Sequence, residues 1–171
     1  MAEEKQYNKV VVVDENDNVI GAEMMFDAIE KGLLRSGARV YVFSESGRVL
    51  IQRRGKDVMR PLMLDQSAAG HVDEGETRLE AAVRELAEET GISGYPLKVV
   101  AEPFRSKGFI NAIYKTVVPD NIQLVPEADE VEELFWLTVP ELDELIKERP
   151  EECTPALFTC RTELRDDLIT T

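Results

Sequence analysis

Acidic side chains crowd one short stretch of the chain, residues 70–92, which reads GHVDEGETRLEAAVRELAEETGI and holds six glutamates. On a helix over residues 78–90, Glu88 and Glu89 lie three and four positions after Glu85, where helical side chains meet. Like charges at this spacing repel one another by roughly a few tenths of a kcal/mol per pair. Carboxylate oxygens are also the ligands that Mg²⁺ prefers, and substrate phosphates commonly complete its coordination. The stretch therefore has two interpretations, a solvated acidic face or a site where divalent cations bind a phosphate group.

The same stretch predicts the helix that would carry these carboxylates. Thr77 can cap its first turn, Glu80 can complete a capping box, and Gly91 can end the helix. At about 100° per residue, three apolar side chains fall within about 60° of one another, and the three carboxylates occupy the opposite arc. The carboxylates are therefore expected to face away from a buried apolar stripe made of Leu79, Val83 and Leu86.

The full spacing of the stretch resembles the signature of the Nudix hydrolase family. Its fixed positions are matched, in order, by Gly70, Glu76, Arg84, Glu85, Leu86, Glu88, Glu89, Gly91 and Ile92. A weaker similarity, from about Val10 to about Leu168, resembles a subgroup related to isopentenyl diphosphate isomerase. It is carried by VVDENDNVIG, EKGLLRSGARVYVFSESGRVLIQRR, GHVDEGE and EVEELFWL. A match at every fixed position favours the cation site over the solvated acidic face.

The resemblance implies an α/β fold, a Nudix-type α/β/α sandwich around a mixed β-sheet. It also implies hydrolysis of a nucleoside diphosphate linked to another group, with Mg²⁺, sometimes Mn²⁺, as the cofactor. By position, the expected metal ligands and catalytic residues are Glu85, Glu88 and Glu89, one of which is alternatively the general base. The backbone carbonyl of Ala69 is expected to bind a metal as well. Structural roles, including an ion pair from Arg84 to a motif glutamate, are expected for Gly70, Glu76, Arg84 and Gly91.

Hydrolysis of a diphosphate also needs positive charge, because the substrate repels hydroxide. A divalent cation neutralises that charge and orients a water, and a nearby carboxylate can take the proton of the water. Basic side chains can hold the remaining phosphate oxygens, and the candidates are Arg53 and Arg54, then Arg35, Lys56 and Lys107. The alternative for each of them is an ordinary solvated charge.

Four further side chains have both a functional and a structural interpretation. Glu130 and Glu133 are candidates for an additional carboxylate, although acidic runs are usually solvated. His71 lies beside the expected metal-binding carbonyl, and a histidine bonded to backbone is the simpler interpretation. Trp136 is expected to pack at the end of a strand, with stacking on a base as the alternative.

Isomerase activity is the main competing enzyme function. The isomerase relatives require a cysteine directly before the glycine of GH, where this chain has Ala69. They use histidines in the segment that matches residues 22–35, which contains none, and the only histidine of the chain is His71. A glutamate that they use in a later strand falls near Ile110 or Asn111. The complete motif without these groups favours a hydrolase, and a non-catalytic nucleotide-binding module is the third possibility.

Composition argues against several classes of partner. The chain has 171 residues, a net charge of −14 and a pI near 4.5, which argue against binding to nucleic acid or to anionic membranes. No apolar run reaches transmembrane length, and MAEEKQ lacks the features of a signal peptide. Cys153 and Cys160 are too few for a disulfide framework, so a cytoplasmic location is expected. The expected partner is a small nucleotide, with nucleoside di- or triphosphates favoured, and the oligomeric state is left open.

No repeat or linker divides the chain, so one domain over residues 1–171 is expected. Apolar and alternating runs predict strands at 9–14, 19–22, 38–44, 48–54, 67–72, 96–103, 108–118 and 133–139. The first two form an N-terminal β-hairpin extension, and residues 55–66 are irregular. Further helices are expected from Thr138 to about residue 147 and after Thr154, and a short helix or loop ends at Gly32. The buried face of the last helix is expected to hold Leu157, Phe158, Leu164 and Leu168.

Overall fold

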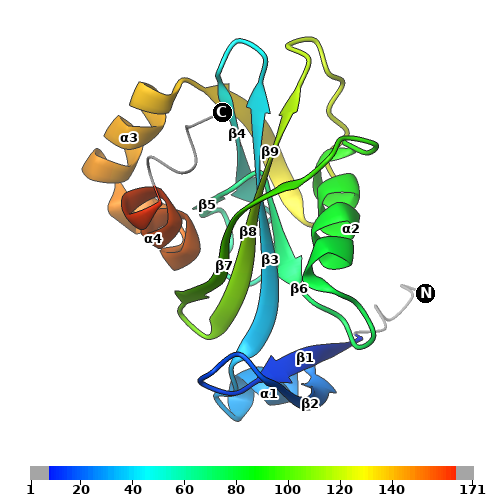
Figure 1. The fold of residues 1–171 in the computed structure, drawn as a ribbon. Coiled ribbons are helices and arrows are strands. Elements are labelled where there is room, and N and C mark those ends of the chain that lie inside the picture. Colours follow the sequence, from blue (N-terminus) through cyan, green and yellow to red (C-terminus); the bar gives the residue numbers. More distant parts are fainter. Residues whose placement is uncertain (1–7, 165–171) are drawn as a thin grey trace, which may run out of the picture.

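The fold comes from a computed structural model, which describes residues 8–164. A mixed β-sheet carries helices on both faces (Figure 1). The strands are β1 Lys9–Val13, β2 Val19–Met24, β3 Arg35–Ser44, β4 Val49–Arg54, β5 Leu64–Asp65, β6 Ala68–His71, β7 Lys98–Ser106, β8 Phe109–Val118 and β9 Val131–Leu137. The helices are α1 Met25–Glu30, α2 Arg78–Thr90, α3 Val139–Glu148, the 3-10 turn η1 Pro150–Glu152 and α4 Pro155–Glu163.

One long parallel pair forms the centre of the sheet. β3 and β8 run together through ten residue pairs, from Arg35 opposite Phe109 to Ser44 opposite Val118. The other pairings between the named strands of the described chain are antiparallel. β6 pairs with β3 over residues 37–40, whereas β4 pairs with β3 only at Phe43 and continues into β5 and β9. The motif strand β6 therefore lies along the first half of β3, where α2 contacts both strands.

Two apolar cores lie on opposite faces of the sheet. Because side chains alternate along a strand, Val40 and Val42 of β3 join the core beneath α2, whereas Tyr41 joins the core beneath α3 and α4. Figure 1 shows α2 on one side of the strands and α3 with α4 on the other. This arrangement is the α/β/α sandwich that the resemblance implied.

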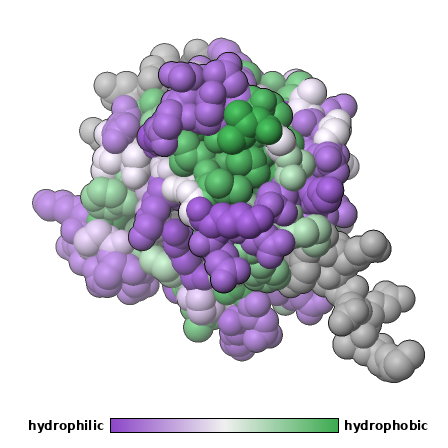
Figure 2. Space-filling model, turned by 90° about the horizontal axis from the view of Figure 1, so that it is seen from below, coloured by the Kyte–Doolittle hydropathy of each residue, from purple (hydrophilic) through white to green (hydrophobic). Residues whose placement is uncertain are grey.

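The predicted N-terminal hairpin is present. β1 and β2 pair antiparallel, and the Asp14 carboxylate closes their turn by accepting the backbone N–H groups of Asn16 and Asn18 at 2.8 and 2.9 Å. β2 and α1 leave several apolar side chains half or more exposed, and Figure 2, seen from the hairpin end, shows an apolar patch ringed by hydrophilic residues. No helix within residues 8–164 has the length and apolar content that a bilayer crossing requires.

The rotation of α4 differs from the expectation. Leu157 is fully buried and Leu164 packs against the same core, but Phe158 is 42% exposed, so its predicted place on the buried face was wrong. The reason is the start of the helix, where Thr154 accepts the Leu157 N–H and donates to the Asp65 carboxylate at 2.9 Å. These hydrogen bonds at the start of α4 turn Leu157 toward the sheet and Phe158 away from it. Leu168 lies outside the described residues.

Candidate metal and active site

Helix α2 begins and ends where the sequence predicts. The Thr77 side chain accepts the Glu80 N–H, and the Glu80 carboxylate accepts the Thr77 N–H at 2.7 Å, which completes the capping box. Gly91 takes a left-handed conformation with a φ of 76°, and its N–H bonds to the Ala87 carbonyl. Both ends of the motif helix are therefore fixed by local hydrogen bonds.

The face that α2 turns toward the sheet is not the predicted one. Leu79 and Val83 are 47% and 48% exposed, whereas Glu85 and Glu89 are only 9% and 4% exposed. The buried face is completed by Ala81, Ala82, Leu86 and Thr90. The small alanines let the helix approach the sheet closely, and donors on the sheet receive the carboxylate of Glu89. The prediction that the carboxylates lie opposite the buried face was therefore wrong for Glu85 and Glu89.

Glu89 is held by two donors from the sheet. Its Oε2 accepts the backbone N–H of Ala69 at 2.9 Å and the side-chain amide of Gln52 at 2.8 Å. Complete burial raises the pKa of Glu89 well above its ordinary value, and the charge of Glu85 raises it further. The two hydrogen bonds and the charge of Arg54 act in the opposite direction. Glu89 thus lies between the motif strand, β4 and the basic residue at the end of β4.

Glu85 packs directly on the backbone of β6 at Gly70. A Cβ atom at position 70 would lie 1.9 Å from Oε1 of Glu85, so only glycine leaves space for this carboxylate. Burial raises the pKa of Glu85 to about 7, the neighbouring Arg84 opposes this shift, and the charges of Glu88 and Glu130 add to it. The charge of Glu130, a candidate for an additional carboxylate, therefore acts on a motif glutamate.

Arg84 forms the expected ion pairs with motif glutamates. Its guanidinium bonds to both oxygens of Glu76 at 2.7 and 2.9 Å, to Glu85 at 2.8 Å and to Glu88 at 3.3 Å. It also donates to the His71 carbonyl at 3.1 Å. The hydrogen bonds that Arg84 donates to Glu76 do most to raise the pKa of Arg84. Arg84 thus ties the loop after β6 to the carboxylate face of α2.

A hard divalent cation fits these residues. The available donors are the carboxylates of Glu85, Glu88 and Glu89 and the carbonyl of Ala69, all of them oxygen atoms. A cation would relieve the buried negative charge that raises the pKa of both Glu85 and Glu89. Within the described chain, no three His, Cys, Asp or Glu side chains already converge on one point. Glu88 points toward Arg84, but its side chain is 48% exposed and has room to turn.

The basic candidates fall in different places. Arg54 bonds to Asp65 at 3.2 Å and to the Met59 carbonyl, and its charge reaches Glu89. Arg53 instead donates to the Leu62 carbonyl, which ties it to the loop before β5. Adjacent side chains of a strand point to opposite faces, which separates these two arginines. Of the five, Arg54 is the one whose charge acts on the buried motif glutamate Glu89.

The other candidates lie at separate places in the fold. Lys56 is 66% exposed and pairs with Glu132 at 3.2 Å, and Lys107 is exposed in the turn after β7. Glu133 is exposed on β9, opposite Arg53. Trp136 packs partly buried against the α2 core, as the structural interpretation expected. Arg35 is buried on the opposite face of β3 from α2.

Several buried polar residues were missed by sequence reasoning. They are Gln52, which holds Glu89, Asp65, which joins Arg54 to the start of α4, and Arg39 with Asn111, which bond to each other at 3.1 Å. Each interrupts an apolar run, as in VLIQ, ARVYVFS or GFINAIY, and that interruption is the only signal the sequence offers.

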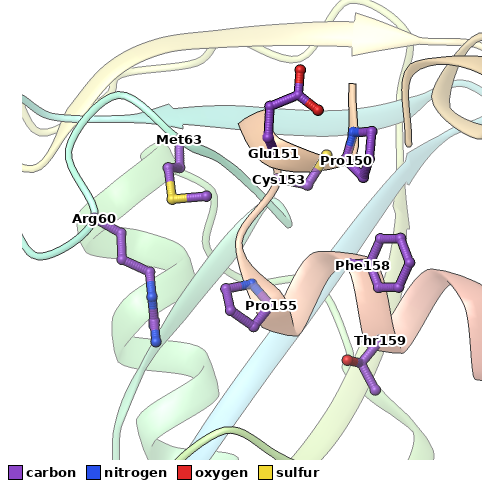
Figure 3. A pocket seen from close by; sticks show the side chains of 8 residues that line it. All are labelled: Arg60, Met63, Pro150, Glu151, Cys153, Pro155, Phe158 and Thr159. Atoms are coloured by element: carbon purple, nitrogen blue, oxygen red, sulfur yellow. The ribbon is translucent and has the colours of Figure 1, made fainter. Parts of the chain in front are cut away.

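An open groove of about 430 Å³ lies between the loop before β5 and the start of α4 (Figure 3). Its lining is mostly apolar, with Arg60 on one side and Glu151 on another, and consists of Arg60, Met63, Pro150, Glu151, Cys153, Pro155, Phe158 and Thr159. The motif carboxylates do not line it. The groove is therefore separate from the motif carboxylates, and Arg60 is the arginine that lines it.

Known proteins similar to this chain match it across most of its length. A profile of the NUDIX domain family matches residues 33–157. An uncharacterised Nudix hydrolase of Yersinia pestis is 34% identical over 151 residues, which cover 85% of this chain and 79% of that protein. Isopentenyl-diphosphate delta-isomerase 2 of Homo sapiens is 32% identical over 164 residues, covering 81% of this chain and 72% of that protein. The crystal structure of DR0079 from Deinococcus radiodurans has a similar fold, with a TM-score of 0.77 and 22% identity over 91% of this chain and 98% of that one.

Proposed function

Because the chain belongs to the Nudix hydrolase family, we propose that it is a Mg²⁺-dependent enzyme that hydrolyses a diphosphate linkage in a nucleotide. The favoured substrates are nucleoside di- or triphosphates, with release of a nucleoside monophosphate. The observation that supports this function is the buried pair of carboxylates, Glu85 and Glu89, against β6. Two buried like charges are costly unless a cation joins them, and a hard cation held there also binds phosphate oxygens.

Each residue of the site has a role in this proposal. Glu85, Glu88 and Glu89, with the Ala69 carbonyl, would hold the cation, and Mn²⁺ could replace Mg²⁺. A cation held there would neutralise the charge of the diphosphate and make water a better nucleophile. One of the glutamates accepts the proton of the attacking water. Arg54 binds phosphate oxygens beside the motif.

The test is product release from a panel of nucleotides with and without Mg²⁺. The panel covers nucleoside di- and triphosphates, nucleotide sugars and dinucleoside polyphosphates. Glu88→Gln and Glu89→Gln are expected to lower kcat by roughly 100-fold or more. Glu144→Gln, an exposed position on α3 across the sheet, removes the same charge and should leave kcat unchanged. Full activity in both motif variants would overturn the metal assignment.

The similarity to the human isomerase makes isopentenyl diphosphate the second substrate to test. Ala69 occupies the position of the isomerase cysteine, and Asn111, near the expected position of the isomerase glutamate, is buried and bonded to Arg39. Neither a methyl group nor an amide transfers a proton, so these positions supply no acid or base for moving a double bond. Formation of dimethylallyl diphosphate would nevertheless replace the hydrolase proposal by an isomerase.

A further inference from the structure

Two arginines are buried side by side on the face of β3 that points away from α2. Arg35 and Arg39 are each only 6% exposed, although arginine is seldom buried without a partner. Both guanidinium groups lie over the ring of Phe109, at 4.5 and 5.0 Å from its centre. Stacking on an aromatic face holds a guanidinium flat and leaves its N–H groups directed outward.

The two arginines differ in their partners. Arg39 donates to Asn111 at 3.1 Å and lies 4.0 Å from the Asp65 carboxylate. For Arg35, no hydrogen bond or ion pair within residues 8–164 reaches the guanidinium, and its buried Nε has no acceptor. A buried, unpaired guanidinium costs more than contact with one aromatic ring returns. An acceptor from outside the chain would satisfy it.

One glycine leaves space for the Arg35 guanidinium, and another leaves space for the Asn111 side chain that binds Arg39. A Cβ atom at Gly108 would lie 2.5 Å from the Arg35 guanidinium. A Cβ atom at Gly37 would lie 2.4 Å from the Asn111 oxygen that holds Arg39. The backbone therefore accommodates both arginines in their present positions, which is the arrangement of a built site.

The surroundings of the pair are positive. Burial lowers the pKa of Arg35, and the charges of Arg60 and Arg39 add to this effect. Burial likewise lowers the pKa of Arg60, with contributions from Arg39 and Arg54. Asp65 pairs with Arg39 and Arg54, so the arginines outnumber the carboxylate that they share. This local excess of positive charge is opposite in sign to the net charge of −14 of the chain.

His71 adds a hydrogen-bonding group beside the arginines. Its ring lies 4.9 Å from that of Phe109, and its buried Nε2 has no partner in the described chain. This ring nitrogen can bond to a phosphate oxygen or hydroxyl.

We infer that Arg35, Arg39 and Arg60 form a receptor for the terminal phosphate of the substrate, so that the enzyme prefers nucleotides whose last phosphate is unesterified. This inference rests on the proposed function and names its substrate class. A free terminal phosphate carries a charge of about −2 near pH 7, whereas each phosphate of a capped diphosphate carries about −1. Several converging guanidinium groups match the more highly charged, three-oxygen end. The charge of Arg54 acts on both Arg60 and Glu89, which links this receptor electrostatically to the motif.

The test compares a nucleoside diphosphate with the same nucleotide methylated on its terminal phosphate. The wild-type enzyme should favour the free diphosphate at least tenfold in kcat/KM. In Arg35→Gln the ratio of kcat/KM for the free diphosphate to that for the methylated one should approach one, mainly through a higher KM for the free diphosphate. The matched control is Arg48→Gln, because Arg48 also lies over an aromatic ring, Trp136, at 5.7 Å but is exposed beyond the far end of β3. Unchanged preference in Arg35→Gln would overturn the receptor.

Measurements of thermal stability and of pyrophosphate binding distinguish the receptor from a purely structural role of Arg35 and from the proposed function. Removing an unpaired buried charge should leave the metal-free melting temperature of Arg35→Gln unchanged or higher, whereas a structural arginine would lower it. Pyrophosphate without Mg²⁺ should bind the wild type at least tenfold more tightly than Arg35→Gln. Should that variant not fold, the half-buried Arg60→Gln carries the same comparison. If the wild type binds pyrophosphate but hydrolyses no nucleotide, the receptor is supported and the proposed function is wrong. If the wild type and Arg35→Gln bind pyrophosphate equally, the receptor is wrong.

Discussion

At the scale of single residues, the space at Gly70 determines where the carboxylate of Glu85 can lie. A Cβ atom there would overlap this carboxylate, at 1.9 Å from Oε1 and 2.1 Å from Cδ. Gly70→Ala is therefore expected to displace Glu85 and to reduce kcat by roughly 100-fold, the size of effect seen when a catalytic group is misplaced. Steady-state hydrolysis of the best nucleotide, with Mg²⁺ titrated, measures this loss.

A second glycine provides the control for that substitution. Gly94 has a φ of 81° on the surface, and a Cβ there meets nothing within 4 Å. Gly94→Ala should cost about 1 kcal/mol of stability through backbone strain while keeping kcat. If Gly70→Ala lost no more activity than Gly94→Ala, the packing of Glu85 against β6 would not matter for catalysis.

The buried carboxylates also predict how stability changes with pH. Glu89 has a folded pKa well above 4.5 and Glu85 one of about 7, so the native state holds protons that the unfolded chain has released. Stability from this source is complete below the unfolded pKa and falls as pH rises through the folded values. The metal-free unfolding free energy should therefore drop by at least about 1 kcal/mol between pH 5 and pH 8.

Urea unfolding in EDTA at several pH values measures this drop. Glu89→Gln should show a smaller drop than Glu144→Gln, which removes the same formal charge from an exposed site. Mg²⁺ at pH 8 should restore stability to the wild type more than to Glu89→Gln, because a ligand stabilises the state that binds it. Parallel pH curves for the two variants would contradict the burial of Glu89.

At the scale of elements, the orientation of α2 can be tested by two substitutions on different faces. Val83 is 48% exposed, so Val83→Lys should change stability by no more than about 0.5 kcal/mol. Leu86 is 2% exposed in the core beneath α2, so Leu86→Ala should cost about 2–5 kcal/mol. Urea unfolding followed by circular dichroism measures both. A large loss for Val83→Lys would mean that α2 turns the stripe of Leu79 and Val83 toward the sheet.

The same helix shows which features a sequence reveals. Its ends were predictable because Thr77, Glu80 and Gly91 act on backbone groups within a few residues. Its rotation was not predictable, because the donors that receive Glu89 come from Ala69 and Gln52, far away in the sequence. Apolar periodicity counts Leu79 and Val83 as core residues and gives no weight to such donors.

The arginines near the motif show the same limit to what can be predicted from the sequence. Arg53 and Arg54 are adjacent in the sequence, and the pairing of β4 with β5, which one strand alone does not specify, brings Arg54 to Asp65. Arg39 and Asn111 sit in apolar runs that predict strands correctly. Their contact depends on the parallel register of β3 and β8, which neither run specifies alone.

At the scale of the whole molecule, the central strands serve two cores. β3 contributes to the core beneath α2 through its even-numbered residues and to the core beneath α3 and α4 through Tyr41. The C-terminal segment joins the second core. There the Thr154 hydroxyl donates a hydrogen bond to Asp65, and the backbone of Cys153 pairs with that of Leu64 in an isolated β-bridge. Unfolding either side would expose strands that the other side needs, so the single domain predicted over residues 1–171 should unfold in one cooperative transition.

The two cores carry separate natural probes of this transition. Trp136, the only tryptophan, packs against the core beneath α2, while Cys153 and Cys160 lie in the other core at 3% and 0% exposure. Burial raises the pKa of the two thiols to about 11 and 12, so they should react slowly with a disulfide reagent until the protein unfolds. Tryptophan fluorescence and thiol labelling, followed across the same urea series, should therefore share one midpoint. Labelling of both thiols at urea concentrations that leave the fluorescence native would show instead that the C-terminal helices leave the sheet as a separate unit, with α2 and the motif strand still folded.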